Sequence, residues 1–467
     1  MSYIKRIIAG TAAMVMLCAV SCDDNKSAEN RTAPTENIVP TEAPTESPEE
    51  KIKGTTITWL ADFSLDSQDG SGSPTALSLF RDYYGCDVEF VPIGSDGKYA
   101  TLEYLLNCGD PIDMFPYDRT AMPQGVVKEL FDPLDSYFEI MGVNEGLWDD
   151  MKPAMEKLKF NGAYYVMPYS VSAPDLVMYS RKLVKKEKLD DPYELYKQGK
   201  WDWDVMMDMM GKFVSNAEAG TLRYGINGSF GEALLASTGK TAVNYENGKF
   251  SNNIKDKDIA AAENFMKKIS DENLYNPNWH EFYPNDNSTL FYVMGDWALG
   301  MTNAKNAKKD IMVVPFPKIP DGDKYYISCD YDAKMLVKWS ANPDAVAAYM
   351  KCERTAALED SYKEIEKKAL SVKEKDAYNK WKPFVTEEQY DAVQSYLETA
   401  KENPYFDFGY GMGEKMYGLG DLTYDTRGVM NNLTEAFVNG ERAVESWEQM
   451  CDDMTEKAND EIKKYNG

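Results

Sequence analysis

Asp296 and Trp297 stand together in the segment FYVMGDWALGM, which runs from Phe291 to Met301. An apolar run ends there at Gly295, and Gly300 follows the acid and the indole. An indole offers a flat apolar face, and a carboxylate offers charge-assisted hydrogen bonds that fix the orientation of a bound group. The two glycines allow the backbone to turn so that the indole faces a cleft. The alternative is a core tryptophan that covers the end of a sheet.

A second polar group follows a short apolar run in MFPYDRT, where Tyr117, Asp118 and Arg119 come just after the expected end of a strand. Asp62 follows the strand-like TITWLA in the same way. Open α/β sheets place ligand contacts at the carboxyl ends of their strands, so these side chains are candidates for binding. The alternative for Asp118 and Arg119 is an ion pair in a surface turn.

Catalytic chemistry has weaker support in the sequence. Two carboxylates can hydrolyse a glycosidic bond, but a chain with 77 acidic residues always offers some pair, so their presence decides nothing. The one histidine, His280, lies in the loop-like NPNWHEFYP, and no GxSxG supplies a nucleophile elbow for it. HExxH, a P-loop and a GxGxxG that opens a helix after a strand are also absent from the sequence. We therefore expect neither catalysis nor a cofactor.

The cysteines argue against a metal or redox site. Besides Cys22 and Cys18, the chain has five, and none belongs to a CxxC pair. The five are Cys86, Cys108, Cys329, Cys352 and Cys451. Their odd number leaves at least one unpaired within the chain, and whether any disulfide forms stays open.

The order of patterns along the chain predicts the α/β class. TTITWLADF is strand-like, SPTALSLFRDYYG is a helix with Ser73 as its cap and Gly85 as its stop, and CDVEFVPI alternates like a strand. Helical KYATLEYLLNCG and the short strand PIDMFPY follow. Such alternation favours mostly parallel sheets with covering helices.

The N-terminus reads as an export signal. Lys5 and Arg6 precede the apolar run from Ile7 to Val20, which is too short to span a bilayer comfortably. AVSC then places a small residue before Cys22 and resembles the lipobox of bacterial lipoproteins, in which that cysteine is lipidated and becomes the new N-terminus. An ordinary cleaved signal with an incidental cysteine is the alternative. We expect residues 1–21 to be the signal.

Residues 22–50 are expected to be a lipid-anchored, disordered linker. TAPTENIVPTEAPTESPEE is rich in Pro, Thr and Glu and has too few large apolar residues to offset the entropy of the chain. The part of the chain after the linker is long enough for more than one core, and the whole sequence has 43% hydrophobic and 12% aromatic residues. Its net charge of −26 becomes −28 without the two basic residues of the signal, so nucleic acid is a poor partner.

Eight segments of the sequence together resemble the family 1 extracellular solute-binding proteins of bacterial ABC importers, the group that contains the maltose-binding protein. They occur in the family's order across nearly the whole mature chain. The segments are ITWLAD, LFRDYYGCDVEFV, GDPIDMFPYDR, GAYYVMPYSVSAPDLVMYSRKLV, KWDWDVMMDMM, FYVMGDWALGM, IMVVPFPKIPDG and ANPDAVAAYM.

The resemblance implies the two-lobed type II periplasmic-binding-protein fold, with a mostly parallel sheet in each lobe and crossing hinge strands. Carried over, residues 51–175 and 311–355 form lobe one, and residues 176–310 and 356–467 form lobe two. The family closes its lobes on a solute, because a ligand that contacts both lobes stabilises the closed state. The implied protein is a monomer, held by acylated Cys22 on the outer face of the cytoplasmic membrane, that hands a sugar to the permease subunits.

The resemblance also implies site residues. Trp297 matches the position whose indole stacks on sugar, with Asp296 beside it, and the loop at 117–119 is two residues shorter than in the maltose binder. Ser172 replaces that protein's glutamate at the crossover, which argues against maltose itself but leaves a hydroxyl contact. Asp62 falls where the family often has a sugar-binding acid. The further aromatic candidates are Tyr169, Phe230, Tyr410 and Tyr424.

Several alternatives stay open at this stage. With 31 tyrosines, any single one can be a packing residue. An acidic cleft can hold a polyamine or a cationic peptide in place of an oligosaccharide. A surface adhesin or sensor component with the same fold has the same sequence features, and a secreted glycoside-processing enzyme is the remaining class.

Overall fold

The computed structural model describes residues 48–66, 74–277, 288–306, 310–375, 380, 382–418, 427–435 and 446–466. The chain divides into two units, Met1–Thr45 and Glu46–Gly467, and all of the first unit lies outside the described residues. The predicted signal, Cys22 and most of the predicted linker therefore fall outside them, as do His280 and Tyr424. Everything below concerns the second unit.

The predicted linker ends earlier than Glu50. Helix α1 (Pro48–Ile52) begins at Pro48. Proline suits the first turn of a helix, and Ile52, two residues past the predicted linker, is only 5% exposed, so the helix buries an apolar side chain where the folded part was predicted to begin. The carbonyl of Ile52 accepts a hydrogen bond from Cys86 Sγ at 3.1 Å, which fastens the helix to the folded body.

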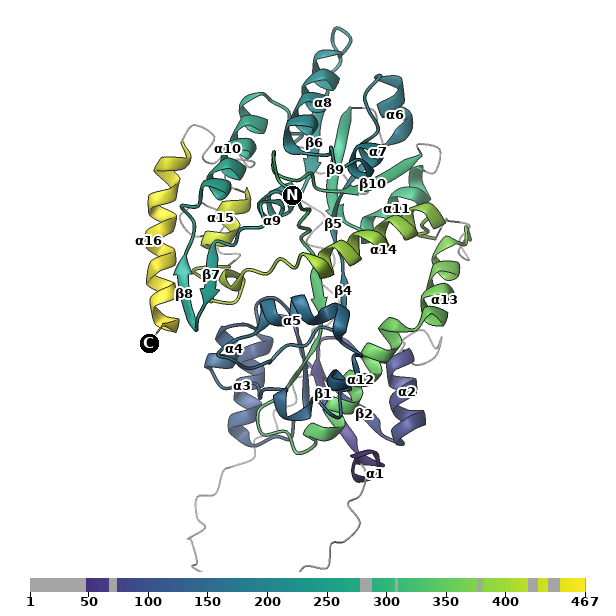
Figure 1. The fold of residues 1–467 in the computed structure, drawn as a ribbon, viewed down its shortest axis with the longest axis vertical. Helices are drawn as coiled ribbons and strands as arrows, with labels where there is room; N and C mark the ends of the chain where they lie inside the picture. The colour runs from purple at the N-terminus through teal and green to yellow at the C-terminus, as the bar shows by residue number, and fades with distance from the viewer. Residues whose placement is uncertain are drawn as a thin grey trace, which may run out of the picture. The chain divides into compact units, whose positions relative to one another are not determined.

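The first sheet has four strands in the order β12–β3–β1–β2. Strand β1 pairs in parallel with β2 and β3, and β12 pairs antiparallel with β3. Figure 1 shows this sheet in the lower half of the molecule, with α2, α3, α5 and α12 around it. The bounds are β1 Thr56–Ala61, β2 Asp87–Pro92, β3 Met114–Pro116, β12 Lys334–Leu336, α2 Thr75–Tyr84, α3 Lys98–Cys108, α4 Gln124–Val127, α5 Lys152–Leu158 and α12 Pro343–Leu358.

The sheet forms because its strands are apolar on the faces that the helices cover. Trp59, Leu60 and Ala61 are fully buried in β1, and α2 packs Leu77 and Phe80 inward. The predicted stop of α2 is confirmed: Gly85 has a φ of 61°, a left-handed conformation that glycine adopts without steric cost.

The second sheet has the order β10–β5–β9–β6. Only β6 and β9 pair in parallel, whereas β5 runs antiparallel to both β9 and β10. It therefore departs from the mostly parallel arrangement expected, because β5 enters directly from a strand that crosses between the sheets, not through a covering helix. The bounds are β5 Asp175–Ser180, β6 Tyr224–Gly228, β9 Thr289–Gly295, β10 Ile311–Pro315, α6 Arg181–Lys186, α7 Pro192–Lys197, α8 Trp203–Ser215, α9 Phe230–Ser237, α10 Lys257–Asp271, α11 Trp297–Asn306 and α14 Glu387–Glu402.

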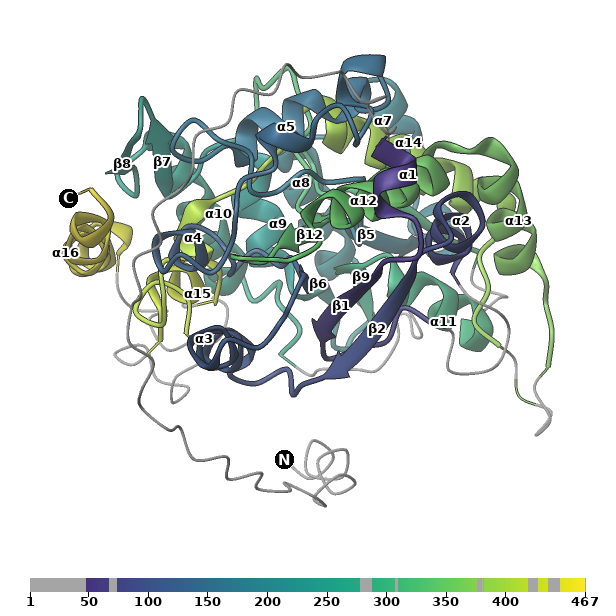
Figure 2. The same cartoon turned by 90° about the horizontal axis from the view of Figure 1, so that it is seen from below.

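Two short crossing strands connect the sheets. β4 (Ser170–Ser172) pairs antiparallel with β11 (Asp330–Asp332) in a separate two-stranded ribbon. Ala173, next after β4, has a φ of 47°, which is strained for a residue with a Cβ atom. A third connection runs from α12 through α13 (Asp360–Ser371) to α14, which packs on β10. Figure 2 shows α13 at the edge of the molecule.

The lobe boundary predicted at residue 311 does not agree with the strand pairing of the two sheets. Ile311–Pro315 is a strand of the second sheet, because its backbone pairs with β5 along its whole length, and the chain returns to the first sheet only at β12. On the other side of the molecule, the C-terminal part packs on α9 and α10. The elements of this part are the 3-10 turn η6 (Phe408–Tyr410), α15 (Val429–Glu435) and α16 (Trp447–Tyr465). The hairpin of β7 (Val243–Glu246) with β8 (Lys249–Asn252) packs against η6 and α16.

The five cysteines outside the signal region are all described, and each is a free thiol. Within the described residues no helix combines the length and apolar content needed to cross a bilayer. The same residues contain no group of three or more His, Cys, Asp or Glu arranged to hold a metal ion.

Candidate functional site

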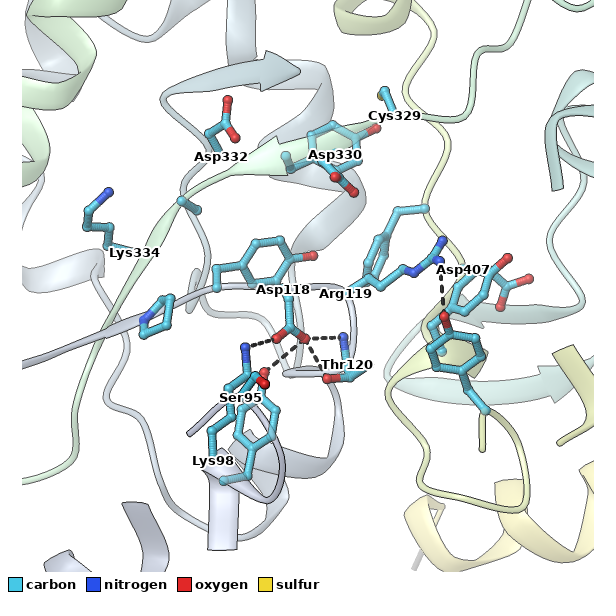
Figure 3. Close-up of a pocket in the computed structure, with 18 of the residues that line it drawn as sticks. Ser95, Lys98, Asp118, Arg119, Thr120, Cys329, Asp330, Asp332, Lys334 and Asp407 are labelled. Carbon is cyan, nitrogen blue, oxygen red and sulfur yellow. Dashed lines mark hydrogen bonds and ion pairs between the residues drawn. The ribbon is translucent and has the colours of Figure 1, made fainter. Parts of the chain in front are cut away.

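A cavity of about 710 Å³ lies where the first sheet, the crossing ribbon and the second lobe meet (Figure 3). The first lobe contributes the end of β1, the start of α3 and the loop after β3, and the second contributes α9 and the segment from Tyr405 to Tyr417. Among the residues predicted from the sequence, five line this cavity: Tyr117, Asp118, Arg119, Tyr169 and Tyr410.

Asp118 is fixed by the loop that follows β3. Its Oδ1 accepts hydrogen bonds from the backbone N–H of Thr120 at 2.8 Å and from the Tyr99 hydroxyl at 3.0 Å. Its carboxylate also forms an ion pair with Lys98, the first residue of α3. Burial raises the pKa of Asp118, but the bonds from Lys98 and Thr120 outweigh it and hold the pKa below its ordinary value. Asp118 is thus an anchored, ionised group.

Arg119 reaches from the first lobe to the second. Its guanidinium forms an ion pair with Glu232, in the first turn of α9, and donates to the Tyr417 hydroxyl at 3.1 Å. The guanidinium carbon lies 4.3 Å from the centre of the Tyr410 ring and 5.2 Å from that of Tyr417. Charge and π faces therefore hold Arg119 against the second lobe.

Glu232 is positioned by a close approach of α9 to α15. A Cβ atom on Gly231 would lie 1.8 Å from the carbonyl oxygen of Thr434, so only glycine fits next to Glu232. The Glu232 carboxylate also accepts a hydrogen bond from Ser328 Oγ at 3.1 Å. Each of these contacts directs Glu232 toward the cavity wall.

Lys334, at the start of β12, is 4% exposed and paired. Its Nζ lies 2.9 Å from Glu353 Oε1 and donates to the Tyr169 hydroxyl at 2.9 Å. It also lies 4.8 Å from the centre of the Tyr169 ring and 5.5 Å from that of Trp59. A buried lysine with these partners keeps its charge and locks the two rings in place.

The crossing ribbon supplies the roof of the cavity in Figure 3. Asp332 accepts hydrogen bonds from Ser170 Oγ at 2.7 Å and from Ser172 Oγ at 2.8 Å. The predicted site residue Ser172 thus bonds within the ribbon and is not part of the cavity wall. Asp330 lines the cavity, and its carboxylate points from β11 toward the side where Asp118 and Arg119 lie.

Three tyrosine hydroxyls on the cavity wall have no hydrogen-bond partner among the described residues. They belong to Tyr117, Tyr405 and Tyr410, and their oxygens are buried. The whole side chains of Tyr405 and Tyr410 are only 7% and 5% exposed. Buried polar atoms normally find partners, so three orphans around one cavity mark places where a bound molecule donates or accepts.

Besides Ser172, four predicted site residues lie elsewhere than on the cavity wall. Trp297, the first residue of α11, is 59% exposed, and Asp62 is exposed just past β1. Asp296 lies at the end of β9, where burial, above all, raises its pKa to about 6 and the charges of Asp330 and Asp332 add to the effect. Phe230 is 1% exposed and packs on the Tyr275 ring in the core, because α9 turns Glu232 and not Phe230 to the cavity.

Sequence reasoning missed several residues of the wall. Asp330, Asp332 and Lys334 alternate in DYDAK, a period of two that places side chains on one face of a strand, and this signal was available. No comparable pattern marks Lys98, Glu232 or Tyr405, since each comes from a different element.

Comparison with known proteins agrees with this architecture. The family model for bacterial extracellular solute-binding proteins matches residues 67–352. No curated protein sequence matches the chain.

Solved structures of similar fold cover most of the chain. The galacto-N-biose/lacto-N-biose I-binding protein of an ABC transporter from Bifidobacterium longum has a TM-score of 0.58 and 13% identity, over 88% of this chain and 98% of its own. The cyclic α-maltosyl-1,6-maltose binding protein from Arthrobacter globiformis has 0.58 and 13%, over 88% and 100%. MalE3 of T. maritima, with maltose bound, has 0.53 and 14%, over 88% and 99%.

These likenesses support the two-lobed α/β fold predicted from the sequence, and the family match covers more than half of the chain. The chain belongs to the family of bacterial extracellular solute-binding proteins.

Proposed function

We propose that this chain is the lipid-anchored substrate-binding subunit of an ABC importer and that its solute is a carbohydrate, an oligosaccharide. The family role supports solute capture, and the solved structures of like fold include complexes with lacto-N-biose and maltose. The chemistry of the cavity is the stronger argument, because the identities to those proteins are low.

A sugar ring has apolar C–H faces and a belt of hydroxyls, so it needs flat aromatic surfaces together with fixed donors and acceptors. The cavity is within the usual size of ligand sites, roughly 300–1,000 Å³. Its aromatic lining is Trp59, Phe63, Tyr99, Tyr117, Tyr169, Tyr331, Tyr405, Phe406, Tyr410 and Tyr417. Charged groups that are already held in place stand among these rings.

The single observation that carries the proposal is the set of three unpartnered hydroxyls, Tyr117, Tyr405 and Tyr410. One belongs to the first lobe and two to the second. A polyhydroxylated ligand satisfies hydroxyls on both sides at once, and so favours the closed arrangement of the lobes. Trp297, exposed at the start of α11, is proposed as a further platform for the sugar, with Asp296 beside it.

Binding without bond cleavage fits the state of the acids on the cavity wall, where the carboxylate of Asp330 is the only one without an ion pair or hydrogen bond among the described residues. Asp118, Glu232 and Asp332 all hold ion pairs or hydrogen bonds, and Asp407 accepts backbone N–H bonds from Val243 and Gly409. A glycosidase needs two carboxylates free to donate a proton and to attack. We further propose that the protein is monomeric, that acylated Cys22 attaches it to the outer face of the membrane, and that the permease takes the solute from the closed form.

The proposal is tested by thermal shift of the mature chain carrying Cys22→Ser, against disaccharides and oligosaccharides, polyamines and short basic peptides. A sugar at a hundred times its Kd adds about 2.7 kcal/mol to the free energy of unfolding, which raises the midpoint by several degrees. Stabilisation by polyamines or peptides alone would overturn the carbohydrate assignment. Release of reducing ends by the purified chain would overturn the assignment as a binding protein.

A further inference from the structure

Every cation on the cavity wall already has a carboxylate partner. Lys98 pairs with Asp118, Arg119 with Glu232, and Lys334 with Glu353. These three pairs are close to neutral as units. The net charge that a ligand meets is therefore set by the carboxylates that remain.

On the wall, Asp332 and Asp407 accept hydrogen bonds from the protein, and the carboxylate of Asp330 alone has neither an ion pair nor a hydrogen bond among the described residues. The backbone brings two further carboxylates, those of Asp175 and Asp296, near Asp330. The N–H of Asp175 bonds to the carbonyl of Ser328 at 2.9 Å, two residues before Asp330. The N–H of Asp296 bonds to the carbonyl of Pro174 at 3.1 Å, and Asp175 is paired in register with Gly295. Asp175, Asp296 and Asp330 thus lie on three adjacent segments, of which Asp330 lines the cavity and the other two residues do not.

No cation neutralises this group, which we call the acid trio. No ion pair is formed by Asp175, Asp296 or Asp330 in the described part of the chain, although Arg119 acts on two of them at longer range. Burial and the charges of neighbouring carboxylates both raise the pKa values of this group. Burial, followed by the charge of Glu232, raises the pKa of Asp175 to about 7. Burial, followed by Asp332, Glu232 and Asp118 against the effect of Arg119, raises that of Asp330 as well.

The unpartnered hydroxyls are an independent sign that a ligand belongs beside the trio. Tyr405 and Tyr410 are more than nine-tenths buried with no partner for their hydroxyls, and both line the cavity that Asp330 lines. The Tyr117 hydroxyl is close enough to Asp330 and Asp118 to feel their charge. A ligand that satisfies both features carries an ammonium group and several hydroxyls.

Resting on the proposed carbohydrate function, we infer that the solute is an amino sugar or an oligosaccharide containing one, with its free ammonium group held by Asp330 and with Asp175 and Asp296 close by. A cation placed there relieves the repulsion within the trio and gains charge-assisted hydrogen bonds. A linear polyamine satisfies the trio but leaves the aromatic surfaces and tyrosine hydroxyls without the ring they suit. A neutral sugar leaves the trio unpaired.

The test uses matched triplets of saccharides with the mature Cys22→Ser chain. Each triplet contains a neutral sugar, its 2-amino-2-deoxy form and the N-acetylated form of the latter, in gluco and galacto configurations, as monosaccharides and β-1,4-linked disaccharides. Isothermal titration calorimetry at pH 7 is expected to give the free amine at least 10-fold tighter binding than the other two members of its triplet. Since acetylation removes the charge and keeps the ring, the comparison isolates the ammonium group.

Asp330→Asn is the decisive variant, because it keeps the shape of the side chain and removes its charge. It is expected to abolish the preference for the amine, so that the three members of a triplet bind within about 3-fold of one another. Asp82→Asn, on the exposed face of α2, is the matched control and is expected to retain the preference.

The outcomes separate the inference from the function on which it rests. Equal or tighter binding of a neutral or acetylated sugar overturns the inference and leaves the carbohydrate function standing. Binding of spermidine with no sugar bound overturns the carbohydrate function. Binding of none of these probes counts against both.

Discussion

Arg119 of the first lobe and Glu232 of the second form an ion pair across the cavity, between residues 113 positions apart in sequence. Both side chains are about one-third exposed or less, at 33% and 26%. The pair therefore combines a bridge between the lobes with a place on the wall that a ligand contacts.

Glu232→Gln should loosen this bridge. A partly buried pair of this kind is worth about 1–2 kcal/mol, more than an exposed pair and less than a fully buried one. We expect a lower free energy of unfolding in urea and a larger radius of gyration of the unliganded protein in small-angle scattering. The matched control is Glu194→Gln, an exposed acid on α7. If the double variant with Arg119→Gln loses as much as the two single variants summed, the two side chains are not coupled.

Tyr405→Phe and Tyr410→Phe should separate stability from binding. Each removes a buried hydroxyl that has no partner within the described residues, so the unliganded protein should be as stable as the parent or slightly more stable. Affinity for the solute should fall by about 10-fold for each, equivalent to about 1.4 kcal/mol. Tyr104→Phe, on the exposed side of α3, serves as the control in thermal melts and calorimetry. Unchanged affinity in both variants would remove these hydroxyls from the site.

Gly411→Ala should disturb the site through the backbone. A Cβ atom there would lie 1.7 Å from the carbonyl oxygen of Met122, and the Gly411 carbonyl accepts a hydrogen bond from Gln124 N–H at 3.1 Å. The segment with Tyr410 would have to move away from the first lobe, and we expect weaker ligand binding and a lower melting temperature. Gly211→Ala, in α8 with open space around it, should instead raise stability by up to about 1 kcal/mol.

Asp175→Asn should change the pH dependence of stability. The folded-state pKa of Asp175 is about 7, above the unfolded value of about 3.9, so the folded protein binds the extra proton between these pH values. The contribution of this group to the free energy of unfolding therefore falls as the pH rises through that range. Above about pH 7, where Asp175 is ionised in both states, its destabilising effect is complete. The variant should therefore gain more stability over the parent at pH 8 than at pH 5 in urea titrations. Equal gains at both pH values would contradict the assignment.

Glu263→Met should stabilise the protein. Glu263 lies on α10, is 1% exposed, and neither carboxylate oxygen has a hydrogen-bond partner in the described residues. Burial raises its pKa well above the ordinary value. A methionine of similar volume removes the cost of burying the carboxyl group, about 1–3 kcal/mol, whereas exposed Glu272→Met should change stability by less than 0.5 kcal/mol. Chemical denaturation measures both.

The fold was predictable because the patterns that indicate it are either local, such as a helix stop, or recur in the family's order along the chain. Gly85 ends α2 as its sequence pattern indicates, and the eight segments that resemble the family predicted the two-lobed class. The loop at Tyr117–Arg119 was also within reach, since it follows a strand whose carboxyl end faces the cavity.

Other parts of the site depend on contacts that no local pattern encodes. Phe230 and Glu232 are two residues apart in α9, and only the packing of the helix decides that the acid faces the cavity and the ring the core. The sheet to which Ile311–Pro315 belongs likewise depends on pairing with a distant strand, and an apolar segment does not indicate which strand it will pair with. The hydroxyl of Ser172 is used by Asp332, 160 residues away.

That last contact has a mechanical consequence. Since Asp332 accepts hydrogen bonds from both serines of β4, the two connecting strands are joined by side chains as well as by backbone, and we expect them to move as one unit. Ala173, with its positive φ, lies between this ribbon and β5, and we expect the chain to bend near it when the lobes move. Asp330, on β11, would then move with the ribbon.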